Sequence, residues 1–356
     1  MAKGLYNHRL FEAAVSSAGS KAAKVFDSLK GVIVAVVVVA VIVLGLWAYS
    51  GIWPPLVVIE SPSMQHSDTR SYIGVIDTGD LVIVKKTGGA QEINPYLESM
   101  PNGYQTYSEY GDVIIYHPLG NTLITPIIHR AICRVEYNAT GGGYDVPSLQ
   151  DLPASMWEVS SGPKTWYNIK SALTLHGIGY NSISVTIDFG IIKSHSGPSP
   201  QGGLITMGDN NHGIVDQMTS ICPQPVRDEW VQGVSRGEIP WFGLLKLWIS
   251  GPAPAAVPEN SKTNLFVSLA LIIGVPIALD ATSLILERRG IDFWGRVRQV
   301  FGLKPKDEKK QGDGEAKKAP TPPIDAKKTG DKKPPSSQKK SSGQSPSKKN
   351  QGKKKK

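Results

Sequence analysis

The chain has 356 residues, a formal net charge of +9 at pH 7 and only two cysteines, Cys133 and Cys222. The length suits about two structural units of ~150 residues, and the absence of a Cys/His cluster at ligand spacing argues against a structural zinc site. In an oxidising compartment the two thiols could form a disulfide, although the sequence does not show whether their Cα atoms are close enough.

The first predicted element is an apolar segment, residues 32–49, which contains no charged side chain. A run of this kind meets the ~20-residue requirement of a helix that spans a bilayer. The alternative is a cleaved signal peptide, because Ala48, Tyr49 and Ser50 resemble a small-x-small cleavage site. The polar segment 1–31 is longer than the basic leader of a signal peptide, which favours an uncleaved anchor.

A second apolar run, residues 265–286, predicts a second membrane span. It contains Gly274, Pro276 and Asp280. Glycine and proline are tolerated in a span when neighbouring groups satisfy the backbone. A carboxylate inside the bilayer is costly and requires a partner or water.

The charge distribution orients these two spans. The net charge is +3 over residues 1–31, −7 over residues 50–264 and +14 over residues 287–356. The positive-inside rule therefore predicts two cytoplasmic termini and an outer domain formed by residues 50–264. Residues 304–356 are mostly Lys, Pro, Ser and Gly, which predicts a disordered tail. Because the tail follows a span, an electrostatic contact with the lipid bilayer is favoured over binding to nucleic acid, which is not expected.

Within the outer domain the pattern is mainly β. Gly-Asp turns at Gly79 and Gly111 each lead into a run of β-branched residues, and residues 123–135 form another apolar run. These patterns predict strands. The stretches 87–110 and 138–200 are rich in Gly, Ser, Tyr and Asn and look like insertions, and the second is expected to form a small subdomain.

The outer domain ends in an apolar and aromatic stretch from Ile239 to Trp248. Its two tryptophans among leucines are typical of the bilayer interface. The alternative is a core segment of the domain, and the sequence does not distinguish the two.

Four polar side chains stand in apolar, strand-like surroundings: Ser63, His129, Asp209 and Asp216. A serine hydrolase needs a hydroxyl that loses its proton while it attacks a carbonyl carbon. An imidazole accepts that proton, and a carboxylate holds the imidazole in one tautomer. Each residue alone has a structural explanation, such as a turn or a core histidine, so it is the set that indicates catalysis.

The order of these motifs resembles the type I signal peptidases, specifically the archaeal and endoplasmic-reticulum branch. Members of that branch carry a Ser-Met pair, a Gly-Asp strand, a His-Arg pair and a Gly-Asp-Asn-Asn turn in this order, whereas bacterial relatives have lysine in place of the histidine. In this chain the resemblance covers residues 52–92, 111–135 and 203–250, through Ser63-Met64, Gly79-Asp80, His129-Arg130 and Gly208-Asp209-Asn210-Asn211.

The resemblance implies a signal-peptidase-type antiparallel β catalytic domain with Ser63 as nucleophile and His129 as general base. Asp209 or Asp216 is then the carboxylate that orients the imidazole. Asp209 is favoured because it ends an apolar strand, and an orienting carboxylate needs a rigid position. Ser61 and the backbone N–H of Ser63 are the expected hydrogen-bond donors to the oxyanion.

The resemblance also implies the substrate: preproteins cut after small residues at the first and third positions before the scissile bond. An extended signal peptide is expected to pair with a strand edge. The expected partners are these preproteins, the lipid bilayer and the protein-export channel, in an archaeal plasma membrane, and no cofactor or metal is expected. The candidate substrate-binding strand consists of Asp112, Val113, Ile114, Ile115 and Tyr116.

Two alternatives remain open. In the first, the enzyme uses lysine as the base, and Lys85 or Lys86 is the amine. In the second, residues 50–264 form a non-catalytic ectodomain that binds a ligand or joins a surface assembly. This second alternative explains the insertions and the glycosylation sequon at Asn138, but it makes the Ser-His-Asp set a coincidence.

Overall fold

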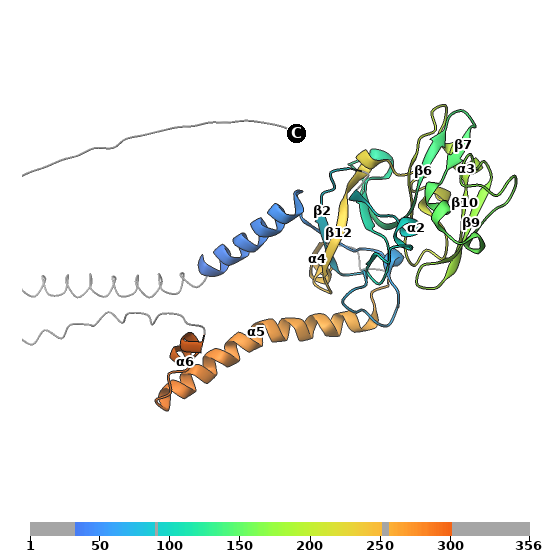
Figure 1. Ribbon diagram of the computed structural model, residues 1–356. Helices are drawn as coiled ribbons and strands as arrows, with labels where there is room; N and C mark the ends of the chain where they lie inside the picture. The colour runs from blue at the N-terminus through green and yellow to red at the C-terminus, as the bar shows by residue number, and fades with distance from the viewer. Residues whose placement is uncertain (1–32, 90–91, 251–255, 301–356) are drawn as a thin grey trace, which may run out of the picture. The chain divides into compact units, whose positions relative to one another are not determined.

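The computed structural model describes residues 33–89, 92–250 and 256–300 of the chain (Figure 1). The predicted cytoplasmic segment 1–31 and the lysine-rich tail 304–356 lie outside the described residues. The chain divides into two compact units, Met1–Ile291 and Asp292–Lys356. The described part of the second unit contains helix α6 (Phe293–Val300).

Two helices, Ile33–Ser50 and α5 (Glu259–Arg288), are long and apolar enough to cross a membrane. Very few side chains in their most apolar windows are buried, so these helices are not core helices of the β domain. The second helix begins before the predicted residue 265, because its first turns pack on the domain through the buried side chains of Ser261 and Leu265. Pro276 lies inside α5 without ending the helix.

The centre of the first unit is a seven-stranded sheet in the order β1-β2-β12-β5-β6-β11, with β7 paired to β6. All of these pairs are antiparallel. The prediction of a mainly β domain accompanied by two apolar helices is therefore confirmed. The strands are β1 (Leu56–Val58), β2 (Leu81–Lys85), β5 (Val113–Tyr116), β6 (Ile127–Asn138), β7 (Gly143–Asp145), β11 (Gly203–Met207) and β12 (Val231–Ile239).

The Gly-Asp turns before β2 and β5 have a common structure. The glycine adopts a positive φ, 98° at Gly79 and 78° at Gly111, which a side chain would disfavour. The aspartate that follows is fully buried. Asp80 accepts the backbone N–H of Trp241, and Asp112 accepts a backbone N–H from the preceding loop. Each turn therefore fixes the start of a strand and anchors a distant segment to it.

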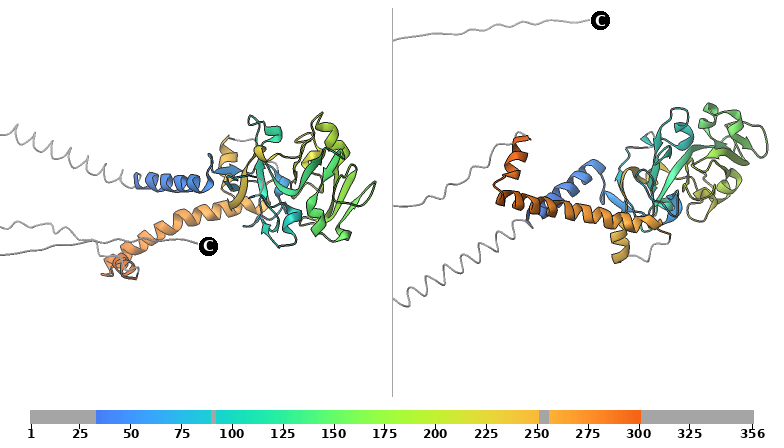
Figure 2. Two further views of the ribbon diagram at one scale, coloured as in Figure 1. Left: turned by 45° about the horizontal axis from the view of Figure 1, so that its top comes forward. Right: turned by 90° about the horizontal axis from the view of Figure 1, so that it is seen from below.

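Apart from β7, which pairs with β6, residues 138–200 form a second layer against the main sheet rather than a separate domain (Figures 1 and 2). The layer contains strands β8 (Trp157–Val159), β9 (Ala172–Ile178) and β10 (Ile183–Asp188) in the order β10-β9-β8, and helix α3 (Phe189–His195). Buried side chains of β6, β9, β10 and α3 belong to one hydrophobic cluster. The other predicted insertion, residues 87–110, contains helix α2 (Tyr96–Ser99) and the short hairpin β3 (Gln105–Thr106) with β4 (Glu109–Tyr110).

The apolar stretch from Ile239 to Trp248 ends in helix α4 (Gly243–Ser250), which has two different faces. Leu244 and Leu247 are buried against Leu265 of α5. Trp248 is 44% exposed, although its ring stacks on Phe266 of α5 with centroids 6.0 Å apart. The stretch is therefore partly core and partly an exposed apolar surface.

The two cysteines are free and buried. Cys133 belongs to the cluster shared by β6 and the second layer, whereas Cys222 packs with Ile114 and Val226 in another cluster. Burial raises the pKa of the Cys222 thiol to about 11 and that of Cys133 still higher, so both remain thiols at neutral pH.

Three carboxyl groups near the Gly79 turn titrate at unusually high pH. Burial raises the pKa of Asp77 to about 6, that of Asp80 to about 8 and that of Glu238 to about 7. Repulsion from Asp77 adds to the shifts at Asp80 and Glu238. The unfolded chain has carboxyl pKa values near ~4, so the folded state binds more protons above that pH. Its stability therefore falls as the pH rises from about 4 through about 8.

We expect Glu238→Gln to flatten part of this decline. Glu238 Oε1 accepts the N–H of Gly74, and the buried Oε2 has no hydrogen-bond partner among the described residues, so an amide keeps the acceptor and removes the titration. Thermal unfolding in detergent between about pH 5 and about pH 8.5 measures the effect. Glu158→Gln, at a side chain 65% exposed, is the control. If the stability of Glu238→Gln depended on pH as that of the wild type does, Glu238 would not contribute to the decline in stability.

Candidate active site

Ser63 lies in a short 3-10 turn, η1 (Pro62–Met64), that follows β1. Proline at the first position restricts φ to the value that the turn needs. The Met64 side chain is 1% exposed and packs with Ile59 in a hydrophobic cluster under the turn. Ile59 is in turn held by two backbone hydrogen bonds to the Gly79-Asp80 turn. The nucleophile candidate is thus anchored on both sides by buried apolar residues.

The Gly-Asp-Asn-Asn turn at residues 208–211 is hydrogen-bonded to the Ser63 turn. The backbone N–H of Asn210 donates to the Ser63 carbonyl oxygen at 2.8 Å, and Asn210 Nδ2 donates to the Pro62 carbonyl at 3.1 Å. A Cβ at Gly208 would clash with the Ser63 carbonyl and lie 2.9 Å from His129 Nε2. Glycine is required at position 208 because the two turns are in direct contact.

His129 reaches the nucleophile candidate from β6. It is opposite Ile114 in the pairing of β6 with β5, and its side chain is 6% exposed. Its Nε2 lies 2.9 Å from Ser63 Oγ. A hydroxyl and an imidazole at this distance can transfer a proton directly.

The other imidazole nitrogen faces Asp216. His129 Nδ1 lies 2.7 Å from Asp216 Oδ2 and 2.9 Å from Oδ1. The same carboxylate accepts the hydroxyls of Tyr116 and Thr206, each at 2.7 Å. Asp216 is 1% exposed and begins the 3-10 turn η6 (Asp216–Met218). Three donors and burial hold the carboxylate in place, so it fixes the Nδ1–H tautomer of the histidine.

The sequence-based preference for Asp209 over Asp216 is wrong. Asp209 makes a bidentate ion pair with Arg130, at 2.8 and 2.7 Å, and its Oδ2 lies 3.1 Å from Nε2 of His66. Burial alone would raise the pKa of Asp209, but the charge and hydrogen bonds of Arg130 outweigh it and lower the pKa to about 2. Asp209 is rigid, as expected. However, Arg130, rather than His129, is the β6 side chain that it contacts.

Ser61 is close to the nucleophile candidate, as the sequence predicts. Its Oγ is exposed and lies 3.2 Å from Ser63 Oγ. A hydroxyl two residues before the nucleophile can turn toward a negatively charged oxygen that forms beside Ser63.

Ser63 and His129 open into a groove of about 800 Å³. Segment 54–61, which includes β1, lines this groove, and so does segment 125–129 at the start of β6. The walls are mainly apolar, with Val57, Ile59 and Ile128 among the lining residues. β1 is the last strand at its end of the sheet, so its outer edge pairs with no strand of the described residues.

The predicted substrate-binding strand is wrong. β5 is a central strand, paired with β12 on one side and with β6 on the other, and all of its side chains are fully buried. No extended peptide can add to a strand whose two edges are occupied. The residues concerned, Asp112, Val113, Ile114, Ile115 and Tyr116, are structural, apart from the hydrogen bond of Tyr116 to Asp216.

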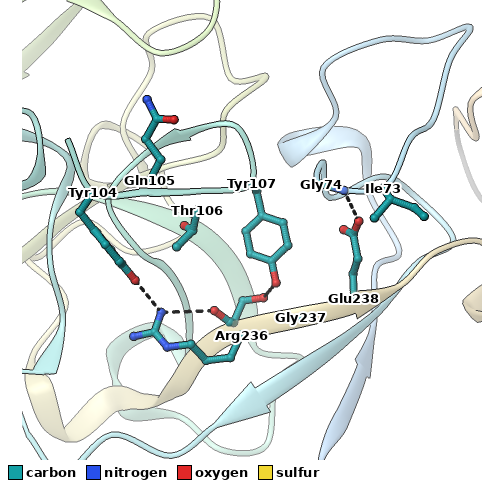
Figure 3. Close-up of a pocket in the computed structure, with 10 residues that line it drawn as sticks. Ile73, Gly74, Tyr104, Gln105, Thr106, Tyr107, Arg236, Gly237 and Glu238 are labelled. Carbon is teal, nitrogen blue, oxygen red and sulfur yellow. Dashed lines mark hydrogen bonds between the residues drawn. The ribbon is translucent and has the colours of Figure 1, made fainter.

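A second cavity, of about 390 Å³, lies over β12 (Figure 3). In Figure 3, Arg236 points toward Tyr104, and Glu238 points toward Gly74. The Arg236 guanidinium pairs with the buried Asp112. None of Ser63, His129 and Asp216 lines this cavity, so it is separate from the candidate active site.

The structure gives no support to lysine as the base. Lys85 and Lys86 are exposed at the end of β2. The ammonium group of Lys85 lies 5.4 Å from the centre of the Tyr49 ring. In the part of the chain that the structure describes, the hydrogen-bond partners of Ser63 Oγ are His129 and Ser61, and neither is a lysine.

Sequence reasoning missed several residues of the site. Tyr116 was assigned to substrate binding rather than to Asp216, and neither Thr206 nor His66 was assigned a role. The alternation of side chains along β11 places Thr206 on the face opposite Met207, but only the sheet order shows which neighbours that face has. Arg130 was noted as a motif residue without a partner.

Comparisons with known proteins identify no relative. No protein-family model matches the chain, and neither does a curated protein or a solved structure. A function for the site is therefore inferred from the described geometry and from the motif resemblance.

Asp209→Ala should destabilise the fold strongly. It leaves the Arg130 guanidinium, which is 1% exposed, without its carboxylate, and breaking a buried ion pair typically costs about 3–5 kcal/mol. Chemical denaturation in detergent measures the free energy of unfolding. The matched control is Asp228→Ala, which breaks the more exposed pair with Arg134 and should cost at most about 1 kcal/mol. Equal losses in the two variants would contradict a structural role for the Asp209 pair.

Proposed function

We propose that the protein is a membrane-bound serine endopeptidase that removes signal peptides from exported preproteins, similar to the archaeal and endoplasmic-reticulum type I signal peptidases. The observation that carries the proposal is the line of contacts from Ser63 Oγ through both nitrogens of His129 to Asp216, at 2.9 and 2.7 Å. A serine, a histidine and a buried carboxylate in this order are what nucleophilic catalysis by serine needs.

In the first half of the reaction, Ser63 Oγ attacks the carbonyl carbon of the scissile peptide bond and its proton passes to Nε2 of His129. The tetrahedral intermediate then collapses, the C–N bond breaks, and the imidazolium gives its proton to the leaving amine. In the second half, water attacks the ester formed between the substrate acyl group and Ser63 and loses its proton to His129. The C–O bond to Ser63 then breaks, Oγ takes the proton from the imidazolium, and the peptide with the new carboxyl end is released. The Asp216 carboxylate stabilises the imidazolium in both halves.

The oxyanion of each tetrahedral intermediate needs donors that are already in place. The proposed donors are the hydroxyl of Ser61 and the backbone N–H of Ser63. The Ser61 hydroxyl lies 3.2 Å from Ser63 Oγ, and the Ser63 backbone is fixed by the contacts of Asn210 with the turn.

The groove supports an extended substrate. A peptide that lies between segment 54–61 and segment 125–129 can pair with the outer edge of β1 and point alternate side chains into the apolar walls. The apolar lining suits apolar side chains of the substrate at alternate positions. This replaces β5 with β1 as the proposed substrate-pairing strand.

The apolar helices support a site close to a bilayer. The helix Ile33–Ser50 ends a few residues before β1, and the turn that carries Ser63 begins a few residues after β1. In the proposed topology both termini are cytoplasmic, and residues 50–264 lie outside the plasma membrane. The proposed partners are signal-peptide-bearing preproteins, the lipid bilayer and the protein-export channel.

Cleavage of a preprotein by the purified protein in detergent tests the proposal. We expect Ser63→Ala and His129→Ala to abolish cleavage, and Asp216→Asn to lower kcat by about 10⁴-fold. Ser61→Ala should lower kcat by about 100-fold or more. Ser194→Ala and His176→Ala provide controls of the same residue types, since Ser194 bonds to the Ile191 carbonyl and His176 to Ser184, and neither residue lines the groove. Full activity of the Ser63→Ala variant, or none in the wild type, would favour a non-catalytic ectodomain.

Protease treatment of right-side-out vesicles tests the proposed topology. Residues within 50–264 should be digested, and the lysine-rich tail should be protected, because the +14 charge of residues 287–356 disfavours export. An antibody against a tag at the C-terminus detects the tail. Loss of the tag while residues 50–264 stay intact would show that the orientation is the reverse of the proposed one.

A further inference from the structure

The tip of the β9–β10 hairpin touches the loops that position Ser63. Tyr180 lies in the connection between the two strands, and its ring stacks on His66 with centroids 4.1 Å apart and an interplanar angle of 14°. Its hydroxyl donates to Asn210 Oδ1 at 3.4 Å. The neighbouring Gly179 donates its N–H to the Tyr96 hydroxyl at 3.0 Å, which fixes the hairpin tip to helix α2.

His66 is held from two sides. It follows Ser63 by three residues, so the two share one loop. Tyr180 covers one face of its imidazole, and its Nε2 lies 3.1 Å from Asp209 Oδ2. Its side chain is 12% exposed. Asp209 is itself held by its ion pair with Arg130. His66, at the end of the Ser63 loop, therefore contacts the hairpin on one side and this ion pair on the other.

Asn210 is the second point of contact. Its backbone N–H and its side-chain Nδ2 both donate to carbonyls of the Ser63 turn, while its Oδ1 accepts the Tyr180 hydroxyl. Through Asn210 and His66, a single tyrosine contacts both segments that determine where Ser63 Oγ lies relative to His129.

Tyr180 is not placed to touch a substrate. Neither it nor His66 lines the groove that opens at Ser63. The ring is half-buried and lies at the end of a hairpin, so a single stacked pair contributes little to global stability. Its contacts instead suit the local positioning of the nucleophile turn.

We propose that Tyr180 is a positioning residue: it holds the Ser63 turn in its reactive position by stacking on His66. The proposal rests on the proposed peptidase function and gives residues 138–200 a role in it. Nucleophile and base must keep their geometry within ~0.5 Å, and a misplacement of ~1 Å can cost about 100-fold in rate. A mobile Ser63 turn therefore lowers turnover, while substrate binding in the groove is preserved.

Steady-state kinetics on a preprotein separates positioning from binding. We expect Tyr180→Ala to lower kcat by about 10-fold or more with KM changed less than about twofold. Tyr180→Phe keeps the stacked ring and should stay within about threefold of the wild type. The matched control is Tyr167→Ala, at a tyrosine of the same layer whose ring packs on Trp166, and it should not change kcat. An increase in KM with unchanged kcat would overturn the proposal.

A double-mutant cycle tests the stacked contact itself. His66→Ala removes the contact from the other side and leaves the hairpin sequence intact, so it also serves if Tyr180→Ala does not fold. If the two residues act through one contact, the variant with both changes should lose no more than about twofold beyond the more damaging single change. Losses that multiply across the two residues would show that they act separately.

Hydrogen exchange tests the proposal without any activity. The Asn210 amide, which donates to Ser63, should exchange about fivefold faster or more in Tyr180→Ala than in Tyr180→Phe. Equal exchange in the two variants would overturn the proposed positioning role. If the wild type cleaves no preprotein, the proposed peptidase function fails, while the exchange comparison still decides whether Tyr180 holds the turn.

Discussion

The ion pair of Arg130 with Asp209 is the interaction on which the site depends. The guanidinium is fully enclosed, and its Nη1 also donates to the carbonyls of Thr106, Tyr110 and Gly111. One cation thus joins strand β6, the turn after β11 and the loop before β5. Removing such a charge from water is costly, and this cost is offset only while every partner stays in place. The segments that contact Arg130 are held in place because the buried guanidinium would otherwise lose its hydrogen-bond partners.

Two neighbouring residues of β6 need two different carboxylates. His129 and Arg130 point to opposite faces of the strand, so no single aspartate can serve both. Asp216 pairs with the imidazole and Asp209 with the guanidinium. The two pairings explain why the candidate site contains two aspartates: Asp216 orients the His129 imidazole, and Asp209 belongs to the turn that contacts the Ser63 turn.

The elements and the site differ in how far the sequence predicts them. Apolar runs and Gly-Asp turns predict the helices and the starts of β2 and β5, because these are local preferences. Ser63 and His129, whose side chains lie 2.9 Å apart, could be selected from the sequence because each belongs to a motif. The role of Asp216 and the central place of β5 were not predictable, since both depend on which strands are neighbours. β12, more than a hundred residues further along the chain, occupies the edge of β5 that seemed free.

The position of β12 also sets the order in which the protein can be completed. This strand lies between β2 and β5 in the sheet but ends at Ile239, shortly before the second apolar helix. Until it is synthesised, β2 and β5 have no strand between them, and the main sheet is incomplete. Pairings so distant in sequence form slowly. The sheet that carries Ser63 and His129 is therefore complete only after almost all of residues 50–264 have left the ribosome, and under the proposed peptidase function a chain would not act on its own first helix during its synthesis.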